Sequence, residues 1–255
     1  MRRTLSVLAA LLVFSVALAG CRSGRAEDPL LQLAAEESLV QGKALLAQGK
    51  YARARPYFTH AFEVEPNSAI GREGLLLAAD TFYLEGGTAN YVQSEAKYRD
   101  YLNRFPTSAQ APYVQFQIAN SLAKRMEKPD RDQTVTRKAV EAYEELVRLY
   151  PTSEYAAQAQ EQVKLVTANL AEHEFVVGRF YLRHGMPFAA MERFQFLLDT
   201  FPEYPDRGKI LYHLGVSQQR LDKPEEAAKV FDRLRTEIPD SPWIAEIPEQ
   251  KNGAS

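Results

Sequence analysis

Five segments of this chain repeat one ordered set of residue types, and this recurrence limits the fold more than any other feature. In the first segment Gly42 is followed by Ala54, Phe58, Ala61 and Pro66. Two helices joined by a turn explain this order. The small residues allow the helices to approach closely, the phenylalanine fills the space on the same face, and the proline ends the second helix because it has no N–H to donate.

Four further copies end at Pro106, Pro151, Pro202 and Pro239. A single hairpin cannot bury its apolar face, so several copies must stack. The pattern is that of the tetratricopeptide repeat (TPR), and it predicts an all-α, TPR-type α-solenoid of about five helical hairpins. The small, aromatic and apolar positions of the later copies are Ser94, Tyr98 and Tyr101; Ala139, Tyr143 and Leu146; Gly178, Gly185, Ala190, Phe194 and Leu197; and Gly215, Ala227, Phe231 and Leu234.

The prolines are 40, 45, 51 and 37 residues apart, whereas an ideal repeat has about 34. We therefore expect a longer turn at residues 84–90 and a charged loop at residues 126–136. Residues 153–184 hold no proline and keep helical spacing of apolar residues, which predicts one long helix joining repeats three and four. The predicted repeats are 34–68, 69–108, 109–153, 154–204 and 205–239, followed by a short cap and disordered tail at 240–255.

The N-terminus has the order of a secretory signal peptide at residues 1–20: two arginines, an apolar run of 14 residues, then small residues. The run is shorter than the roughly 20 residues that a spanning helix needs. Cys21, the single cysteine of the chain, follows directly. This resembles the bacterial lipoprotein signal, which implies that Cys21 becomes an N-palmitoyl, S-diacylglycerol cysteine with residues 21–33 as a tether. The alternative is an ordinary signal peptide with a chance cysteine.

Composition and motifs exclude several classes of function. The net charge of −2 gives no basic surface for a nucleic acid. The sequence contains no phosphate-binding glycine loop, no HExxH, no CxxC and no Gly-x-Ser-x-Gly. We therefore expect no catalytic residues, no metal and no cofactor. The four histidines share no motif and are expected to be surface or groove residues: His60, His173, His184 and His213.

The first helix of each pair lines the inner side of such a stack, so residues on these helices are candidates for a peptide-binding groove. Apolar side chains beside Lys and Arg suit an extended peptide that carries an aromatic side chain and a carboxylate. The alternative is that each is an ordinary surface residue. The candidates are Leu39, Lys43, Leu46, Phe82, Tyr83, Phe175, Arg179, Leu182, Lys209, Tyr212 and Gln219.

A lipoprotein signal followed by five such hairpins resembles the BamD (ComL-like) lipoprotein family of the outer-membrane β-barrel assembly machinery. The likeness spans nearly the whole mature chain and is strongest over residues 130–202. It is carried by Asp130-Arg131-Asp132 leading into LVRLYPTSEY (146–155), and by LAEHEFVVGRFYLRHG (170–185) followed by AAMERFQFLLDTFP (189–202). The first repeat is a generic TPR.

The resemblance implies a non-enzymatic, lipid-anchored protein on the periplasmic face of the outer membrane. It implies that the C-terminal repeats bind the periplasmic domains of the barrel-forming assembly subunit, and that the N-terminal repeats receive unfolded barrel precursors. It leaves contacts to accessory lipoproteins open. Arg193 matches a family arginine that is associated with the contact to the assembly subunit. The alternative interpretation is that Arg193 is an ordinary solvent-exposed side chain. The partner-binding candidates are then Phe175, Arg179, Arg193 and Tyr212, and the precursor-groove candidates are Leu39, Lys43, Leu46, Phe82 and Tyr83.

Two other hypotheses belong to different classes. Another TPR lipoprotein, such as a pilotin for secretin or pilus assembly or a cell-division coordinator, would share the anchor and the repeats. A cell-wall hydrolase would need a catalytic carboxylate in a cleft, and the repeats leave no separate segment to supply one.

Overall fold

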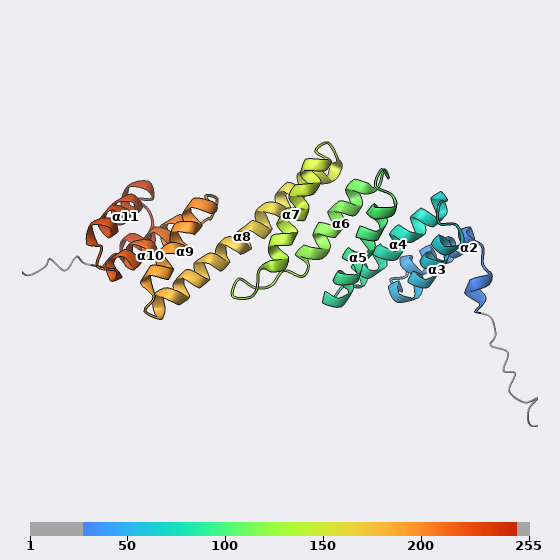
Figure 1. The fold of residues 1–255 in the computed structure, drawn as a ribbon, viewed down its shortest axis with the longest axis horizontal. Helices are drawn as coiled ribbons and strands as arrows, with labels where there is room; N and C mark the ends of the chain where they lie inside the picture. Colours follow the sequence, from blue (N-terminus) through green and yellow to red (C-terminus); the bar gives the residue numbers. More distant parts are fainter. Residues whose placement is uncertain (1–27, 249–255) are drawn as a thin grey trace, which may run out of the picture.

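The computed structural model describes residues 28–248, and within that range the chain is entirely helical, with ten α-helices and no strand. The helices form antiparallel pairs that stack along one elongated body, with the described N-terminal residues at one end and the C-terminal residues at the other (Figure 1). The prediction of a TPR-type α-solenoid is confirmed. The pairs are α2 (Ala35–Ala47) with α3 (Tyr51–Val64), α4 (Ala69–Glu85) with α5 (Thr88–Arg104), α6 (Ala111–Ala123) with α7 (Thr134–Leu149), α8 (Glu154–Arg183) with α9 (Pro187–Thr200), and α10 (Arg207–Arg220) with α11 (Pro224–Glu237).

In three of the pairs a glycine on the first helix lies directly against a phenylalanine ring on the second. A Cβ atom on these glycines would lie closer to the ring than carbon atoms pack, which explains why no larger residue fits. The distance from such a Cβ to the nearest ring carbon would be 2.6 Å for Gly42 and Phe58, 2.7 Å for Gly178 and Phe194, and 2.4 Å for Gly215 and Phe231.

The other repeat positions are buried as well. The small residues at the start of each second helix are all fully buried: Ala54, Ser94, Ala139, Ala190 and Ala227. The aromatic residues one turn later are at most 4% exposed: Phe58, Tyr98, Tyr143, Phe194 and Phe231. Every copy therefore uses the same stripe of its second helix to contact the first.

Helix α8 connects the two halves of the body. It runs unbroken for 30 residues, about 45 Å at 1.5 Å per residue, and crosses the middle of Figure 1. It packs against α7 on one side of the body's centre and against α9 on the other. The predicted long helix between repeats three and four is confirmed.

The buried residues form three separate clusters along the chain. The first core lies in α2–α4 and includes Leu39 and Phe58. The second core runs from α4 to Val166 of α8. The third core begins at Ala171 of the same helix and continues to α11. The boundary between the second and third cores therefore falls inside α8.

The predicted longer turn at residues 84–90 is wrong. Helix α4 extends to Glu85 and α5 begins at Thr88, so only Gly86 and Gly87 lie between them. Their φ values of 76° and 87° belong to the left-handed region that glycine adopts without steric cost. The extra length of repeat two is in its helices, which have 17 residues each.

The expected charged loop is present between α6 and α7, at residues 124–133, although the predicted end at residue 136 lies inside α7. Two side chains of α8 fasten this loop. The Asn169 amide donates to the Glu127 carbonyl at 3.2 Å and to Gln133 Oε1 at 2.8 Å. His173 Nδ1 lies 2.6 Å from the Pro129 carbonyl oxygen. The loop thus ties repeat three to the middle of the connecting helix.

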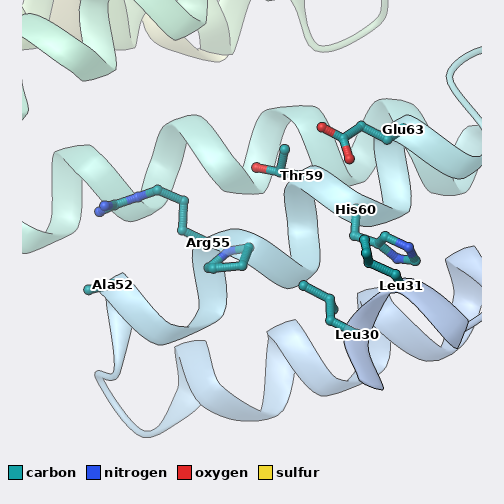
Figure 2. A pocket seen from close by; sticks show the side chains of 8 residues that line it. Leu30, Leu31, Ala52, Arg55, Thr59, His60 and Glu63 are labelled. Atoms are coloured by element: carbon teal, nitrogen blue, oxygen red, sulfur yellow. The ribbon is translucent and has the colours of Figure 1, made fainter. Parts of the chain in front are cut away.

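The N-terminal end of the described chain is partly folded. Pro29–Gln32, inside the predicted tether, forms a 3-10 helix, η1. Figure 2 shows Leu30 and Leu31 of η1 beside α3, where they line a pocket of about 400 Å³ with Ala52, Arg55, Pro56, Thr59, His60 and Glu63. The predicted signal peptide and Cys21 lie outside the described residues.

At the other end, residues 240–248 cap the stack. Pro242–Ile244 forms a second 3-10 helix, η2. Trp243 stacks on Tyr212 of α10 with ring centroids 5.1 Å apart, and its Nε1 donates to Asp206 Oδ2 at 3.3 Å. These contacts cover the last repeat.

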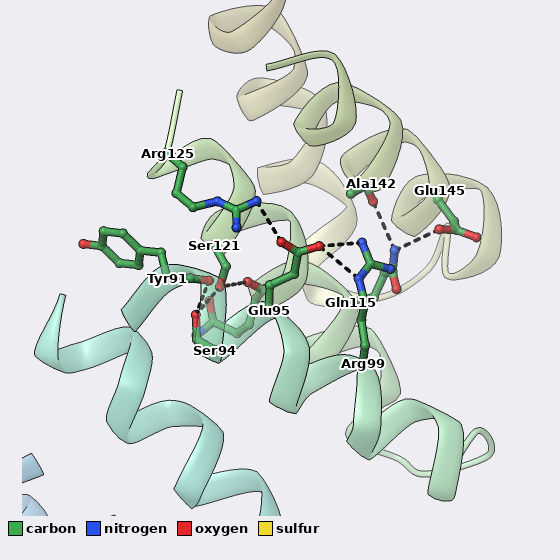
Figure 3. A network of polar contacts seen from close by, with 10 residues as sticks. Tyr91, Ser94, Glu95, Arg99, Gln115, Ser121, Arg125, Ala142 and Glu145 are labelled. Carbon is green, nitrogen blue, oxygen red and sulfur yellow. Dashed lines mark hydrogen bonds and ion pairs between the residues drawn. The ribbon is translucent and has the colours of Figure 1, made fainter. Parts of the chain in front are cut away.

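Repeats two and three are also joined by polar contacts. Figure 3 shows Glu95 of α5 paired with Arg99, 3.0 Å away on the same helix, and with Arg125, 2.8 Å away beyond α6. Ser94 and Ser121 are 2.8 Å apart between the same helices. Glu95 and Arg125 are largely buried, so this ion pair links α5 to the residue that follows α6 at a site shielded from solvent.

Candidate peptide-binding surface

The inner side of the stack is formed by the first helices of the pairs. Helix α2 contacts α4, α6 contacts α8, and α8 contacts α10. The predicted groove residues all lie on these helices, but the structure divides them into buried, paired and open positions.

Three predicted groove residues are core residues. Leu39 is 6% exposed and Phe175 is 1% exposed, so neither lines an open groove, contrary to the prediction. Each stands three residues before the glycine that faces the second helix, Gly42 or Gly178, and therefore shares its face of the helix. Leu182, four residues after Gly178, is buried for the same reason.

The other N-terminal candidates are engaged within the chain. Lys43 is exposed and pairs with Glu73 of α4 at 2.6 Å. Leu46 is half-buried against the first core. The Phe82 ring lies 3.5 Å beneath the Arg55 guanidinium, and Tyr83 packs against the second core. These side chains connect neighbouring helices as well as facing solvent.

The C-terminal candidates Arg179 and Tyr212 lie around one aromatic cluster on α8 and α10. The buried Phe175 ring meets His213 edge-on at 5.1 Å, and His213 meets Tyr212 edge-on at 5.0 Å. Lys209 Nζ lies 3.6 Å from the centre of the Phe175 ring, where a cation is attracted to the π face. The Arg179 guanidinium is farther from that ring, at 5.8 Å. Desolvation lowers the pKa of His213, which favours its neutral form in the cluster.

A carboxylate and a phenol extend this cluster toward the loop before α10. Tyr204 donates to Glu172 Oε2 at 2.5 Å, and Lys209 Nζ lies 3.9 Å from Glu172 Oε1. Burial, followed by the hydrogen bond to Glu172, raises the pKa of Tyr204. The phenol therefore stays protonated and acts as a donor to Glu172.

Arg193 has a partner within the chain. Its Nη1 lies 2.8 Å from Glu174 Oε2, and the Glu174 side chain is only 10% exposed while that of Arg193 is 42% exposed. The pair joins α9 to α8. Arg193 is therefore neither a free solvent arginine nor wholly available to a partner, because it also neutralises a buried carboxylate.

A pocket opens between the first helices of repeats two, three and four, and Tyr101 of α5 and the residues between α5 and α6 complete its lining. It has a volume of about 490 Å³, inside the range of about 300–1,000 Å³ that is typical of ligand sites. Sequence reasoning did not single out its central residues, Asp80 and Tyr113. The lining residues are Ala69, Arg72, Glu73, Leu76, Leu77, Asp80, Tyr101, Ser108, Gln110, Tyr113 and Tyr155.

Asp80 is a half-buried carboxylate that lines this pocket. Its Oδ1 accepts hydrogen bonds from Tyr98 at 2.6 Å and from Tyr113 at 3.0 Å. Desolvation raises the pKa of Asp80, and the two hydrogen bonds act in the opposite direction. The signal available in the sequence was an acidic residue inside the apolar helical run LLLAADTFYL, a position where a charge needs partners.

Within residues 28–248 there is no group of His, Cys, Asp and Glu side chains that could hold a metal ion. The same part of the chain has no helix both long and apolar enough to cross a membrane.

Stacked helical hairpins with glycine–phenylalanine contacts and an inner face of first helices define a TPR-type α-solenoid. The chain belongs to the outer membrane lipoprotein family YfiO, which it matches over residues 32–234.

Several relatives of this chain have the same name, outer membrane protein assembly factor BamD. The chain is 27% identical over 239 residues to the outer membrane protein assembly factor BamD of Rickettsia prowazekii, with 94% of each chain covered. It is 26% identical to BamD of Caulobacter vibrioides, covering 94% of this chain and 78% of that one. It is 27% identical to BamD of Neisseria gonorrhoeae, with 90% of each covered.

Solved TPR structures are more distant. The TPR2AB-domain:pHSP90-complex of yeast Sti1 has a TM-score of 0.44 and 14% identity, covering 80% of this chain and 78% of that chain. A TPR protein of Thermus thermophilus has a TM-score of 0.37 and 16% identity, covering 82% and 93%.

Proposed function

We propose that this protein is a non-catalytic, lipid-anchored scaffold of the outer-membrane β-barrel assembly machinery. The observation that carries the proposal is the alignment with proteins named outer membrane protein assembly factor BamD over nearly their full length. Membership of the YfiO family supports it. The scaffold binds the barrel-forming assembly subunit and the unfolded barrel precursors that are to be folded and inserted.

The two tasks belong to different ends of the solenoid. The C-terminal repeats bind the periplasmic domains of the assembly subunit, with Arg179, Tyr212 and the exposed part of Arg193 as contacts. The N-terminal repeats receive precursors along the inner face, where Lys43 and Phe82 remain candidates. The separate second and third cores support this division, because each half has its own packed interior.

Recovery of the native protein from detergent-solubilised membranes tests the proposal. The barrel-forming subunit should be the main co-purifying protein, and a charge-reversed Arg179→Glu variant should recover less of it. Absence of that subunit from the eluate would contradict the proposal. A pilus or secretin protein in its place would support the pilotin alternative, and hydrolysis of purified peptidoglycan by the protein would support the enzyme alternative.

The anchor is tested separately. Cys21→Ala should release the protein from membranes or leave its signal peptide uncleaved, because the thiol that would carry the diacylglycerol is removed. Membrane flotation after a high-salt wash measures this, with Ser23→Ala as the matched control. A Cys21→Ala protein that still floats with outer membranes would contradict lipid anchoring.

A further inference from the structure

The pocket around Asp80 combines a half-buried carboxylate with an aromatic wall. Asp80 Oδ1 already accepts two hydrogen bonds, whereas within the described residues no hydrogen bond or ion pair reaches Oδ2. A buried carboxylate gains most from a charged donor that supplies both a hydrogen bond and an opposite charge. The chemistry of the pocket therefore favours a cationic ligand group.

The neighbouring charges are already engaged. Arg72 Nη1 donates to the Asn67 carbonyl at 3.0 Å, and the Arg72 guanidinium lies 5.8 Å from the centre of the Phe105 ring. Glu73, on the rim, is paired with Lys43. Asp80 is thus the one carboxylate lining this pocket for which the described residues supply no cation.

The remaining walls suit the rest of a long basic side chain. The half-buried Tyr113 and Tyr155 provide aromatic surface, with their rings 5.8 Å apart and inclined at 59°. Aromatic faces attract ammonium and guanidinium groups. Leu76 and Leu77 offer apolar surface for the methylene stem, which Lys and Arg bury while their charge finds a polar partner.

The position of the pocket points to an extended polypeptide as the bearer of that side chain. Its walls include α4, α6 and the start of α8, so it spans the first helices of three successive repeats on the inner face. A segment lying along this face in an extended conformation directs alternate side chains toward the helices.

We propose that the Asp80 pocket binds a lysine or arginine side chain of an extended segment of an unfolded precursor. This inference rests on the proposed function in one respect only, which is that the extended segment comes from an unfolded precursor. The carboxylate supplies the charge and the hydrogen bond, and Tyr113 and Tyr155 supply the aromatic wall.

The test uses three blocked nine-residue peptides that differ only at the central position, which is lysine, norleucine or glutamate. Binding to the full chain in detergent is measured by fluorescence anisotropy. The lysine peptide should bind about tenfold more tightly than the norleucine peptide, and the glutamate peptide least tightly, as expected for a hydrogen bond to a charged group.

Asp80→Asn should bring the lysine and norleucine peptides to within about twofold of each other, because an amide keeps the size of the side chain but not its charge. Glu141→Gln, at an exposed position of α7 outside this pocket, is the matched control and should keep the preference. Equal binding of the three peptides by the wild-type chain would refute the inference whether or not the variant folds. So would a lysine preference that survives in folded Asp80→Asn.

A further arm separates this inference from the proposed function. An unfolded barrel precursor diluted from urea should bind the wild-type chain. If the precursor binds and the peptides are not distinguished, the cation pocket is wrong and the scaffold function stands. If the lysine preference is present but the precursor does not bind, the pocket stands with another peptide source and the precursor role is wrong.

Discussion

The glycine–phenylalanine contact of repeat five makes a quantitative prediction about Gly215→Val. A Cβ at Gly215 would lie 2.4 Å from one ring carbon of Phe231 and 2.7 Å from the next, whereas carbon atoms pack at about 3.5–4.0 Å. The ring would have to move by about 1 Å. Phe231 is 4% exposed and its helix neighbours Ala227 and Leu234 are fully buried, so the core offers it no free space.

The expected cost follows from two opposing effects. Overpacking of this kind destabilises by about 1–3 kcal/mol, and the two γ-carbons of valine place it in the upper part of that range. Valine has a helix propensity better than glycine by roughly 0.4 kcal/mol. The net loss is therefore about 2 kcal/mol, which is roughly a 30-fold change in a local opening equilibrium.

Hydrogen exchange measures this loss where it occurs. Because the stability of a stacked repeat protein is nearly a sum of local terms, amides of α10 and α11 should exchange roughly 30-fold faster while those of α4–α6 are unchanged. Gln219→Val, a half-buried position on the same helix, is the control for added valine. Phe231→Leu in the Gly215→Val background should restore part of the protection. Unchanged exchange in α10 and α11 would refute the close-approach reasoning.

Three further predictions concern polar side chains. Arg193→Ala should lower the free energy of unfolding in urea by about 1–3 kcal/mol, less than the roughly 3–5 kcal/mol of a fully buried pair because the arginine is 42% exposed; Arg193→Lys should retain most of it, and equal midpoints would contradict a role for the Glu174 pair. Because burial raises the pKa of Asp80, its contribution to stability is greatest below the unfolded-state pKa and is lost as pH rises through the folded-state pKa. Asp80→Asn should therefore unfold at higher urea than wild type at pH 7, by a margin that shrinks toward pH 4; a margin independent of pH would be inconsistent with the shift. Asn169→Ala removes two hydrogen bonds to the loop 124–133 and should speed limited proteolysis there without changing the cleavage rate elsewhere, and an unchanged rate in the loop would show that these bonds do not hold it.

The repeat positions could be predicted from the sequence because their spacing is local. Ala54, Phe58 and Ala61 lie within two turns of one helix, so their common face follows from helical geometry alone. The same reasoning failed for Leu39 and Phe175, which face the second helix with the glycine three residues later. From the sequence alone, an apolar residue at these positions fits either a groove or a core. The glycine three residues later is buried, so the apolar residue on the same face is a core residue.

Two features depended on geometry that sequence spacing does not encode. The Gly86–Gly87 pair suggested a longer turn, yet two left-handed residues reverse the chain in the shortest connection, and the surplus residues extend the helices. The hydrogen bonds to Asp80 come from residues 18 and 33 positions further along the sequence, on α5 and α6. Which side chains meet there depends on how one hairpin stacks on the next.

Because α8 is one continuous helix, the number of residues in it determines how the two halves of the body are oriented relative to each other. Val166 belongs to the second core and Ala171 to the third, so the residues between them set the angle between two packing faces on one rod. Each added residue turns the helix by about 100° and lengthens it by about 1.5 Å. One insertion in this interval would thus rotate the C-terminal repeats about the helix axis and break the contact of His173 with the loop 124–133. The N-terminal and C-terminal halves of the inner face would no longer point the same way.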